Sequence, residues 1–388
     1  MPAGITHASA QQSSKKGEDR LCVHIDDAAK PAGFAIFDGH SGSGAAAACS
    51  ENVLPRLMAT DAPAASHHIS DVLWAIDEEM GRCGGQEQID KDTKIGVGGC
   101  TATLMIVESA DGSNGMQGTI AWCGDSCACV VDMLNGSVAF HTSLHAANDD
   151  NEIALMQRLS SVCKRAEEGG GNDDAINAAL DSTDGQRVLY AATREDEVAL
   201  VRRALARRDL IAETMPRDAD ARRNVFCQHR CSTKAKYSEP GAPLPPQVFA
   251  TRADRSRGGY YDVQMARTIC DWKGPDLVLP HPQIAPLPAM AADGFLRVVI
   301  ASDGLWDECT FDECLDICRR SANAQATADT LLRHAVKDKV DLKLPEGERN
   351  KENMHDDTTV LVVDLNPSGR SPPPLPAASG GGGCCVMM

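Results

Sequence analysis

The sequence predicts an α+β fold, built of stacked and largely antiparallel β-sheets with helices on their outer faces. Short apolar runs typical of strands gather before residue 135 and return after residue 295. Turn signals such as Asp111-Gly112 and Asn114-Gly115 separate neighbouring strands, where a doubly wound parallel sheet would need regular helical crossovers. Hydrophobic residues make up 43% of the 388 residues, so the composition excludes a wholly disordered chain.

In the first third of the chain, the spacing of apolar residues distinguishes strands from helices. Short apolar runs bounded by turns predict strands, and apolar residues three or four positions apart predict amphipathic helices. The predicted order is strand 21–25, strand 34–37, helix 43–57, helix 69–80, and then strands 101–107, 119–123 and 128–133.

The middle of the chain departs from this pattern. Residues 151–208 are charged and predicted to be helical, and residues 216–259 are irregular and rich in Pro, Arg and Gly. The pattern then returns as strand 296–301, helices 311–320 and 324–337, and strand 358–365. The Pro- and Gly-rich residues 366–388 are predicted to form a disordered tail.

Charge and cysteine usage restrict the class of protein. Acidic residues outnumber basic ones by 55 to 38, and the net charge of −17 argues against a nucleic-acid partner. The first 20 residues have no apolar segment that would direct secretion, so we expect the 16 cysteines to be mostly free thiols in a reducing compartment. No apolar stretch is long enough to cross a bilayer. We expect a cytoplasmic monomer, with a nuclear location left open.

Four acidic positions share one feature, because each lies where an apolar strand begins or ends. They are Glu18-Asp19, Asp38, Asp303 and Asp356-Asp357. Carboxylates that meet at the rim of a sheet without counterions repel one another and raise one another's pKa. A hard divalent cation removes that repulsion, and oxygen-only ligands select Mg²⁺ or Mn²⁺. A single Asp-Gly at a strand end is most often only a turn, so the prediction depends on all four positions occurring together.

Two longer stretches, Phe37-Asp38-Gly39-His40 and Ser302-Asp303-Gly304-Leu305-Trp306-Asp307, are specific enough to compare with known families. Four further stretches occur with them in a fixed order: Gly17-Glu18-Asp19-Arg20, Gly99-Cys100-Thr101-Ala102, Gly124-Asp125-Ser126 and Asp356-Asp357-Thr358-Thr359. From about residue 16 to residue 365, the chain resembles the metal-dependent serine/threonine protein phosphatases of type 2C. Its opening segment is most similar to plant or algal members.

The resemblance implies a four-layer α-β-β-α sandwich, in which two antiparallel sheets pack face to face between helices. It implies a phosphatase domain over residues 1–365 with an enlarged flap at 152–259. It also implies two Mg²⁺ or Mn²⁺ ions at one edge of the sandwich. The ligands carried over from the family are Asp38, which would bridge both ions, the carbonyl of Gly39, Asp303 and Asp356, with Glu18 and Asp19 beside the centre.

The resemblance further implies hydrolysis of phosphoserine and phosphothreonine in protein substrates by a hydroxide that bridges the two ions. Two cations about 3.5–4 Å apart lower the pKa of a shared water enough to supply hydroxide near neutral pH. The leaving alkoxide needs a proton, and His40, two residues after Asp38, is the predicted general acid. The alternative is a structural histidine bonded to the loop.

The predicted phosphate-binding segment departs from the family pattern. The arginine that pairs with the substrate phosphate in the family falls at Ser14, next to Lys15 and Lys16. These two lysines are therefore the predicted phosphate-binding residues. Lysine provides charge without the bidentate geometry of arginine, so we expect weaker phosphate binding.

Three other departures concern the surroundings of the centre. Leu144 replaces an aspartate that holds a third, looser ion in the family, which puts that third ion in doubt. Cys270 stands where the family has glycine, and Cys127 where it has arginine. These changes leave open a catalytically weakened pseudophosphatase that acts as a phosphoprotein-binding module. Because Asp38 and Asp303 are intact, an active enzyme is the favoured hypothesis.

The predicted flap is locally basic in an otherwise acidic chain. Its arginines include Arg202, Arg203, Arg207, Arg208, Arg222, Arg223 and Arg230. They either recruit phosphorylated or acidic substrates or form ion pairs along a solvated helix face, and the sequence favours neither.

The last four residues, Cys385-Val386-Met387-Met388, fit a prenylation box in which Met favours farnesyl. One prenyl chain binds membranes weakly, so Cys384 is the predicted palmitoylation site that would add a second anchor for peripheral attachment. The alternative is a Cys-rich terminus that carries no lipid.

Overall fold

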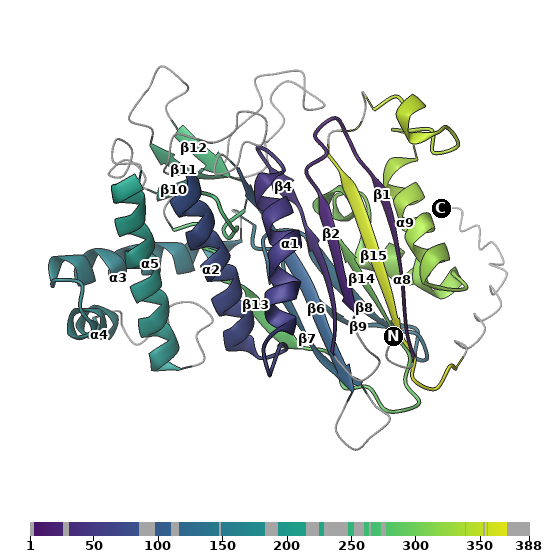
Figure 1. Cartoon of the computed structure of the whole chain (residues 1–388), viewed down its shortest axis with the longest axis horizontal. Coiled ribbons are helices and arrows are strands. Elements are labelled where there is room, and N and C mark those ends of the chain that lie inside the picture. The colour runs from purple at the N-terminus through teal and green to yellow at the C-terminus, as the bar shows by residue number, and fades with distance from the viewer. Residues whose placement is uncertain are drawn as a thin grey trace, which may run out of the picture.

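The computed structural model shows a layered α+β molecule with two sheets at its centre (Figure 1). It describes residues 4–25, 31–84, 98–109, 116–146, 149–182, 193–214, 225–228, 247–251, 260–263, 265–272, 277–337, 339–351, 354 and 356–370.

Two five-stranded sheets, antiparallel throughout, form the centre. The first has the order β1 (Ile5–Gln12), β15 (Thr358–Leu365), β14 (Leu296–Ala301), β8 (Cys127–Asp132) and β9 (Ser137–His141). The second has the order β13 (Gln283–Pro286), β7 (Met116–Cys123), β6 (Ala102–Ser109), β3 (Ala32–Phe37) and β2 (Arg20–Ile25).

Alternate residues of each central strand face different cores. In β3, Phe34 and Ile36 pack between the sheets together with residues of the opposite sheet such as Val298. The intervening Ala35 and Phe37 pack against the helices outside. Since successive side chains point to opposite faces, a strand buried on both faces is apolar at nearly every position. This explains why these strands appear in the sequence as continuous apolar runs.

Helices cover the outer face of each sheet (Figure 1). On the second sheet, α1 (Gly44–Met58) packs on β2 and β3, and α2 (Ser66–Gly84) packs beside it. On the first sheet lie α8 (Phe311–Arg320) and α9 (Ala324–Val336), preceded by the short α7 (Asp303–Trp306). The predicted four-layer α-β-β-α sandwich of two antiparallel sheets is therefore confirmed.

The middle of the chain adds a helical layer that packs beside α2. The charged segment forms α3 (Asp150–Glu168), α4 (Asp173–Asp181) and α5 (Arg194–Thr214), which share a small apolar core that includes Val162, Ile176 and Val201. After them, β10 (Val225–Gln228), β11 (Gln247–Thr251) and β12 (Tyr260–Val263) form a three-stranded sheet where the sequence predicted irregular structure. A short 3₁₀ helix, η2 (Glu346–Glu348), precedes β15.

The proposed domain limits at residue 365 and the flap limits at 152–259 stay predictions. Strand β15 ends at Leu365, and residues 371–388 lie outside the described part of the chain. Within the described part, no helix has the length and apolarity that a membrane crossing requires.

Candidate metal centre

Three carboxylates from distant segments meet at one rim of the sandwich. Asp38 directly follows β3, Asp303 begins α7 after β14, and Asp356 lies two residues before β15. One oxygen atom of each lies within 4.8 Å of the other two. We call these three residues the carboxylate triad. The strand ends thus bring together the acidic side chains that the sequence singled out.

The surroundings of the triad favour a cation. Burial first, and then the charges of Asp303 and Asp19, raise the pKa of Asp38 well above its ordinary value. Burial and the charges of Asp125 and Asp356 do the same for the pKa of Asp303. Oδ1 of Asp303 and Oδ1 of Asp19 are buried without a hydrogen-bond partner among the described residues. Buried oxygens without donors, among carboxylates that repel one another, are the environment that a hard divalent cation satisfies. The residues therefore fit the predicted Mg²⁺ or Mn²⁺.

Glu18 and Asp19 lie beside the triad and are partly satisfied by the chain itself. Oε1 of Glu18 accepts a hydrogen bond from the N–H of Gly42, and Oδ2 of Asp19 accepts one from the hydroxyl of Ser302 at 2.8 Å. Burial is the main reason why the pKa of Asp19 rises to about 6. A Cβ atom at Gly39 would lie 2.8 Å from the carbonyl oxygen of Glu18, so this close approach requires glycine.

The loop before β2 carries the predicted phosphate-binding lysines. Nζ of Lys16 lies 2.7 Å from Oδ2 of Asp356, so its ammonium group neutralises one carboxylate of the triad. Lys15, the neighbouring residue, is exposed. Ser14, at the position of the family arginine, donates its backbone N–H to Asp357 instead of presenting a cation. The phosphate-binding role of the two lysines stays a prediction.

Asp357 has a different role from its neighbour Asp356. The position before the strand did not distinguish the two acids, and only the family resemblance assigned the ligand role to Asp356 alone. Its carboxylate accepts hydrogen bonds from the backbone N–H groups of Ser14, Gly17, Glu18 and Asp19. Burial alone would raise the pKa of Asp357, but these hydrogen bonds lower it below its ordinary value. Asp357 therefore anchors the loop that carries Glu18 and Asp19. Adjacent residues before a strand point in opposite directions, which is the signal that could have separated the two.

Asp125 lies near the triad, although the sequence did not predict it as a site residue. It lies between β7 and β8, and its charge acts on both Asp38 and Asp303. Burial first, and the nearby acids Asp307 and Asp356 as well, raise the pKa of Asp125 to about 6. The Gly124-Asp125-Ser126 stretch matched the family pattern, and that match was the available signal.

His40 lies in the two-stranded pairing of β4 (Gly39–His40) with β5 (Gly99–Cys100). Its Nε2 is 2.9 Å from Oδ2 of Asp271, and that oxygen also accepts a hydrogen bond from the hydroxyl of Thr268 at 3.1 Å. Burial would lower the pKa of His40, but the charge and hydrogen bond of Asp271 outweigh it and raise the pKa. Nδ1 of His40 is buried and has no hydrogen-bond partner in the described part of the chain. The sequence missed Asp271, although its motif was recognised.

Three departures from the family pattern have structural consequences. Cys270 adopts a φ of 64°, a left-handed conformation that favours glycine, and its N–H donates to Oδ1 of Asp77 at 2.7 Å. Cys127 is buried, and its thiol donates to the carbonyl of Asp125 at 3.6 Å. Leu144 is 47% exposed, and its apolar side chain offers no carboxylate at the position where the family has an aspartate. Every cysteine whose side chain the structure describes is a free thiol, as predicted.

The arginines of α5 are paired with acids on other helices. The described pairs are Arg202 with Asp173, Arg203 with Asp71, Arg207 with Asp77, and Arg208 with Glu167. Arg207 and Arg208 are each only 4% exposed. The hypothesis that these two recruit acidic substrates is therefore wrong, because a buried and paired guanidinium offers no free charge. The predicted ion pairs are present, but these four join different helices, and Arg207 and Arg208 are not on a solvated face. Arg194 and Glu197 also pair along α5, at 3.6 Å. Arg222, Arg223 and Arg230 lie outside the described residues, as do Cys384 and Cys385.

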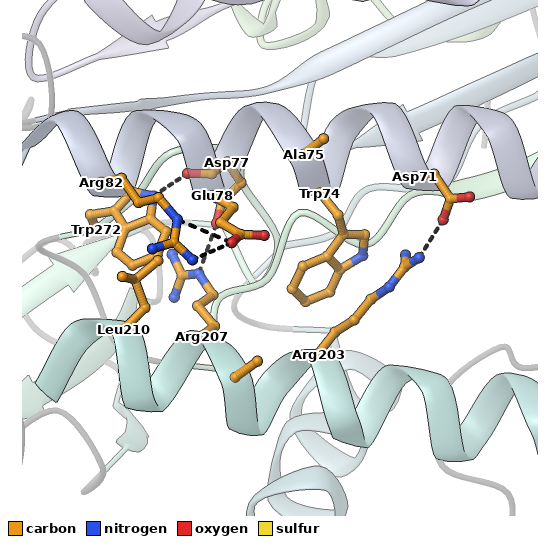
Figure 2. Close-up of a pocket in the computed structure, with 11 residues that line it drawn as sticks. Asp71, Trp74, Ala75, Asp77, Glu78, Arg82, Arg203, Arg207, Leu210 and Trp272 are labelled. Carbon is orange, nitrogen blue, oxygen red and sulfur yellow. Dashed lines mark hydrogen bonds and ion pairs between the residues drawn. The ribbon is translucent and has the colours of Figure 1, made fainter. Parts of the chain in front are cut away.

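Figure 2 shows how α2 and α5 face each other across a cavity of about 340 Å³. Nε of Arg207 donates to Oδ2 of Asp77 at 3.0 Å, and the guanidinium group lies 4.7 Å from the ring centre of Trp272. The carbonyl of Asp77 accepts the indole N–H of Trp272 at 2.7 Å, and Arg207 also donates to the carbonyl of Asp271. We call Asp77, Arg207 and Trp272 the α2–α5 interface. It supports the backbone on both sides of Asp271, which holds His40.

Comparisons with solved structures define the class of fold. The chain is similar to a serine-threonine phosphatase 2C from Toxoplasma gondii, with a TM-score of 0.54 and 15% identity over 94% of this chain and 98% of that one. It is also similar to a C. elegans sex determining protein, with a TM-score of 0.51 and 15% identity over 96% of this chain and 66% of that one. The fold is thus that of a protein phosphatase of type 2C.

The family follows from the sequence comparisons. The protein phosphatase 2C family model matches residues 5–183 and 249–342, so the chain belongs to the protein phosphatase 2C family. It is 25% identical to "Probable protein phosphatase 2C 40" of Oryza sativa subsp. japonica over 93% of this chain, and 23% identical to "Probable protein phosphatase 2C 12" of Arabidopsis thaliana over 94%. It spans 57% and 62% of the length of those two relatives. The predicted resemblance, including the similarity to plant members, is confirmed.

Proposed function

We propose that this chain is a Mg²⁺- or Mn²⁺-dependent protein serine/threonine phosphatase that hydrolyses phosphoserine and phosphothreonine. The observation that carries the proposal is the meeting of Asp38, Asp303 and Asp356 within 4.8 Å, where the described surroundings offer no donor to buried carboxylate oxygens of Asp303 and Asp19. Membership of the protein phosphatase 2C family supports the same reaction and implies phosphoprotein substrates.

The proposed ligands of two divalent cations lie at the rim where the sheets end. They are Asp38, the carbonyl of Gly39, Asp303 and Asp356, with Glu18 and Asp19 beside them. When bound, such ions supply a water that is acidic enough to act as hydroxide near neutral pH. The protein's own contribution is a rigid rim, because Asp357 fixes the loop with Glu18 and Asp19, and Ser302 fixes Asp19.

His40 is the proposed general acid. When the ring is protonated, Nε2–H donates to Asp271 and Nδ1–H remains available for the alkoxide that leaves the phosphate. Asp271 stabilises the charged ring, and the hydroxyl of Thr268 keeps the Asp271 carboxylate oriented. In this proposal, His40 supplies the proton and Asp271 holds the ring in place.

Lys16 pairs with Asp356 in this structure, and in this proposal it binds the substrate phosphate once a cation is on Asp356. Its ammonium group contacts Asp356 in this structure, and a divalent cation on Asp356 would release it toward the substrate phosphate. Lys15 adds a second positive charge at the surface nearby. Both lysines lack the bidentate fork of arginine, so we expect phosphate to bind less tightly than an arginine would allow.

A second candidate function is a pseudophosphatase that binds phosphoproteins without hydrolysing them. The contact of Lys16 with Asp356 favours it, because an ammonium group already neutralises one predicted ligand. The unpartnered oxygen of Asp303 favours the enzyme, because no group of the described chain satisfies it.

The test is the release of phosphate from a phosphothreonine peptide with and without Mn²⁺. We expect metal-dependent release by the wild-type protein, loss of release in Asp303→Asn, and an unchanged rate in Asp316→Asn, which alters an exposed acid on α8. Equal rates for wild type and Asp303→Asn would contradict the enzyme. Peptide binding without turnover, independent of metal, would establish the binding module.

Attachment to a membrane through lipids on Cys385 and Cys384 is a separate proposal that rests on the C-terminal box alone. Mass spectrometry of the C-terminal peptide from eukaryotic cells tests it. A peptide that is always unmodified would contradict it.

A further inference from the structure

A second group of metal-ligating side chains lies in the helical layer over the first sheet. Cys309 lies between α7 and α8, Glu313 is in the first turn of α8, and His334 is in the last turn of α9. One ligand atom of each lies within 4.8 Å of the other two. Among the residues that the structure describes, only this group and the carboxylate triad have that arrangement.

We propose that Cys309, Glu313 and His334 form a binding site for a transition-metal ion of the Zn²⁺ type, separate from the carboxylate triad. A thiolate and an imidazole are ligands that select Zn²⁺ and related ions over Mg²⁺, whereas the triad offers only oxygen atoms. The two sites therefore differ in the class of ion that they bind. This proposal does not depend on the proposed phosphatase activity.

The distances are close to those of an occupied site. With bonds of about 2.0 to 2.3 Å, the ligand atoms of a tetrahedral zinc ion lie about 3.3 to 3.8 Å apart. Nε2 of His334 is 4.0 Å from Oε1 of Glu313. The pairs that involve Cys309 lie within 4.8 Å. An approach of at most about 1.5 Å would therefore close the site, through rotation of the partly exposed side chains of Glu313 and His334.

The carboxylate of Glu313 is already oriented for this role. Its Oε2 accepts hydrogen bonds from the N–H of Thr310 at 2.9 Å and from the hydroxyl of Thr310 at 2.8 Å, in a capping box that begins α8. This leaves Oε1, the atom that faces His334, available for a metal. Ligating carboxylates in metal sites are commonly held in this way by hydrogen bonds to their other oxygen.

The thiol and the imidazole complete a site that opens to solvent on one side. Cys309 is 4% exposed, whereas the side chains of Glu313 and His334 are 51% and 23% exposed. An ion would thus enter past the carboxylate and meet the thiol at the bottom, with a fourth position left for water. Nε2 of His334 now contacts the carbonyl of Glu308 at 3.1 Å, and binding a metal would replace this contact.

Binding at Cys309 requires the loss of one proton. Burial raises the pKa of its thiol to about 12, so the metal must displace that proton to form the metal–sulfur bond. Each ion bound therefore releases one proton to solvent, and no oxidant or reductant takes part.

An ion at this site would join the segment after α7 to the end of α9. Asp303 begins α7, and α9 packs against β15, the strand that Asp356 precedes. We therefore expect the ion to stabilise the helical layer beside the carboxylate triad. The ordinary alternative is that the three residues only cap a helix, fill the core and bond a carbonyl.

The test uses Co²⁺ as the probe on the full chain, after excess Mg²⁺ has been added to occupy the triad. A thiolate bound to Co²⁺ gives a charge-transfer band in the near ultraviolet, which an oxygen-only site does not. We expect a saturable band with one ion bound per chain, removed by Zn²⁺, together with a rise in Tm on adding Zn²⁺. Absence of the band in wild type would overturn the proposal.

Three variants identify the ligands. Cys309→Ser should abolish the band, and His334→Gln and Glu313→Gln should each weaken Co²⁺ binding at least tenfold. Glutamine at 313 preserves the capping box, so that variant separates metal binding from helix capping. Cys22→Ser, at a half-buried thiol on β2, is the matched control and should leave the band unchanged. A band that persists in Cys309→Ser, or that disappears in Cys22→Ser, would also overturn the proposal.

Discussion

The carboxylate triad and the α2–α5 interface both bury aspartates, but they balance the negative charge in opposite ways. Asp77 in the interface has side-chain oxygens bonded to the guanidinium group of Arg207 and to the N–H of Cys270. In the triad, Asp38 and Asp303 have other acids as their main charged neighbours, and an oxygen of Asp303 is buried with no donor among the residues that the structure describes.

The comparison shows why burial alone does not identify a functional acid. Burial raises the pKa of Asp77 as well, but Arg207 and the N–H of Cys270 act against it. The chain thus contributes its own cation to the α2–α5 interface. At the triad, the cation that the described residues place on a carboxylate is Lys16, which contacts Asp356 and not Asp38 or Asp303. An aspartate that lacks a counterion inside the protein is the one that requires a counterion from solution.

The largest expected difference between the two regions is in stability. Asp77→Asn should lower the free energy of unfolding by about 3 kcal/mol, because it leaves the buried guanidinium of Arg207 without its counterion. Asp303→Asn should cause no loss in metal-free protein, because it removes a repelling charge. Urea unfolding in EDTA measures both. Equal losses in the two variants would contradict the difference in charge balance.

Asp271 connects the two regions, and its substitution should affect catalysis. Its carbonyl accepts from Arg207 and its carboxylate holds His40. Asp271→Asn should lower kcat about a hundredfold with little change in KM, because the proton donor loses its orienting charge. Thr268→Val, which removes only the supporting hydroxyl, should have a smaller effect on kcat. Steady-state kinetics with a phosphothreonine peptide in Mn²⁺ measure both, and a change in KM alone would contradict this role.

The pH dependence of stability should also differ with metal. A carboxyl whose pKa is raised to about 6 by folding, as in Asp125, binds its proton more tightly in the folded state. Its contribution to stability is therefore present below the unfolded pKa of about 3.9 and is lost as the pH rises through 6. In EDTA we expect a loss on the order of 2 kcal/mol across this window, and Mn²⁺ should abolish it. Asp125→Asn should reduce the loss in EDTA, and an unchanged profile in that variant would exclude Asp125 as its source.

The smallest effect is expected for an exposed ion pair between α4 and α5. Asp173→Asn breaks the contact with Arg202 on α5, where both side chains are more than half exposed. Exposed pairs contribute about 0.5 kcal/mol, so the variant should unfold almost as the wild type does. A loss as large as that of Asp77→Asn would show that burial does not separate the two kinds of pair.

Most of the central elements were predictable because their signal is local. The predicted ranges 296–301, 311–320 and 358–365 coincide with β14, α8 and β15. Strand β1 was missed, because its sequence Ile5–Gln12 is mostly polar and its conformation comes from pairing along its whole length with β15. Local periodicity cannot reveal a strand that is defined by a distant partner.

The candidate site also combines features that local sequence predicts with features that depend on tertiary contacts. The places of Asp38, Asp303 and Asp356 at strand ends were legible in the sequence, because strand ends are set by local apolar runs. The role of Asp357 as the anchor of the loop with Glu18 and Asp19 was not, nor was the bond between Asp271 and His40, because each depends on which atoms meet after folding.

By itself, the sequence determined the layered fold, the order of its strands and helices, and the acids that stand at the strand ends, since apolar spacing and turn residues act over a few positions. Only the tertiary structure decided which buried acids receive a cation from the chain. Arg207 on α5 pairs with Asp77 on α2, although the two helices are far apart in the sequence. Among the described residues, no hydrogen-bond donor contacts Oδ1 of Asp303. Charge compensation depends on distance in space, which the order of residues along the chain does not contain.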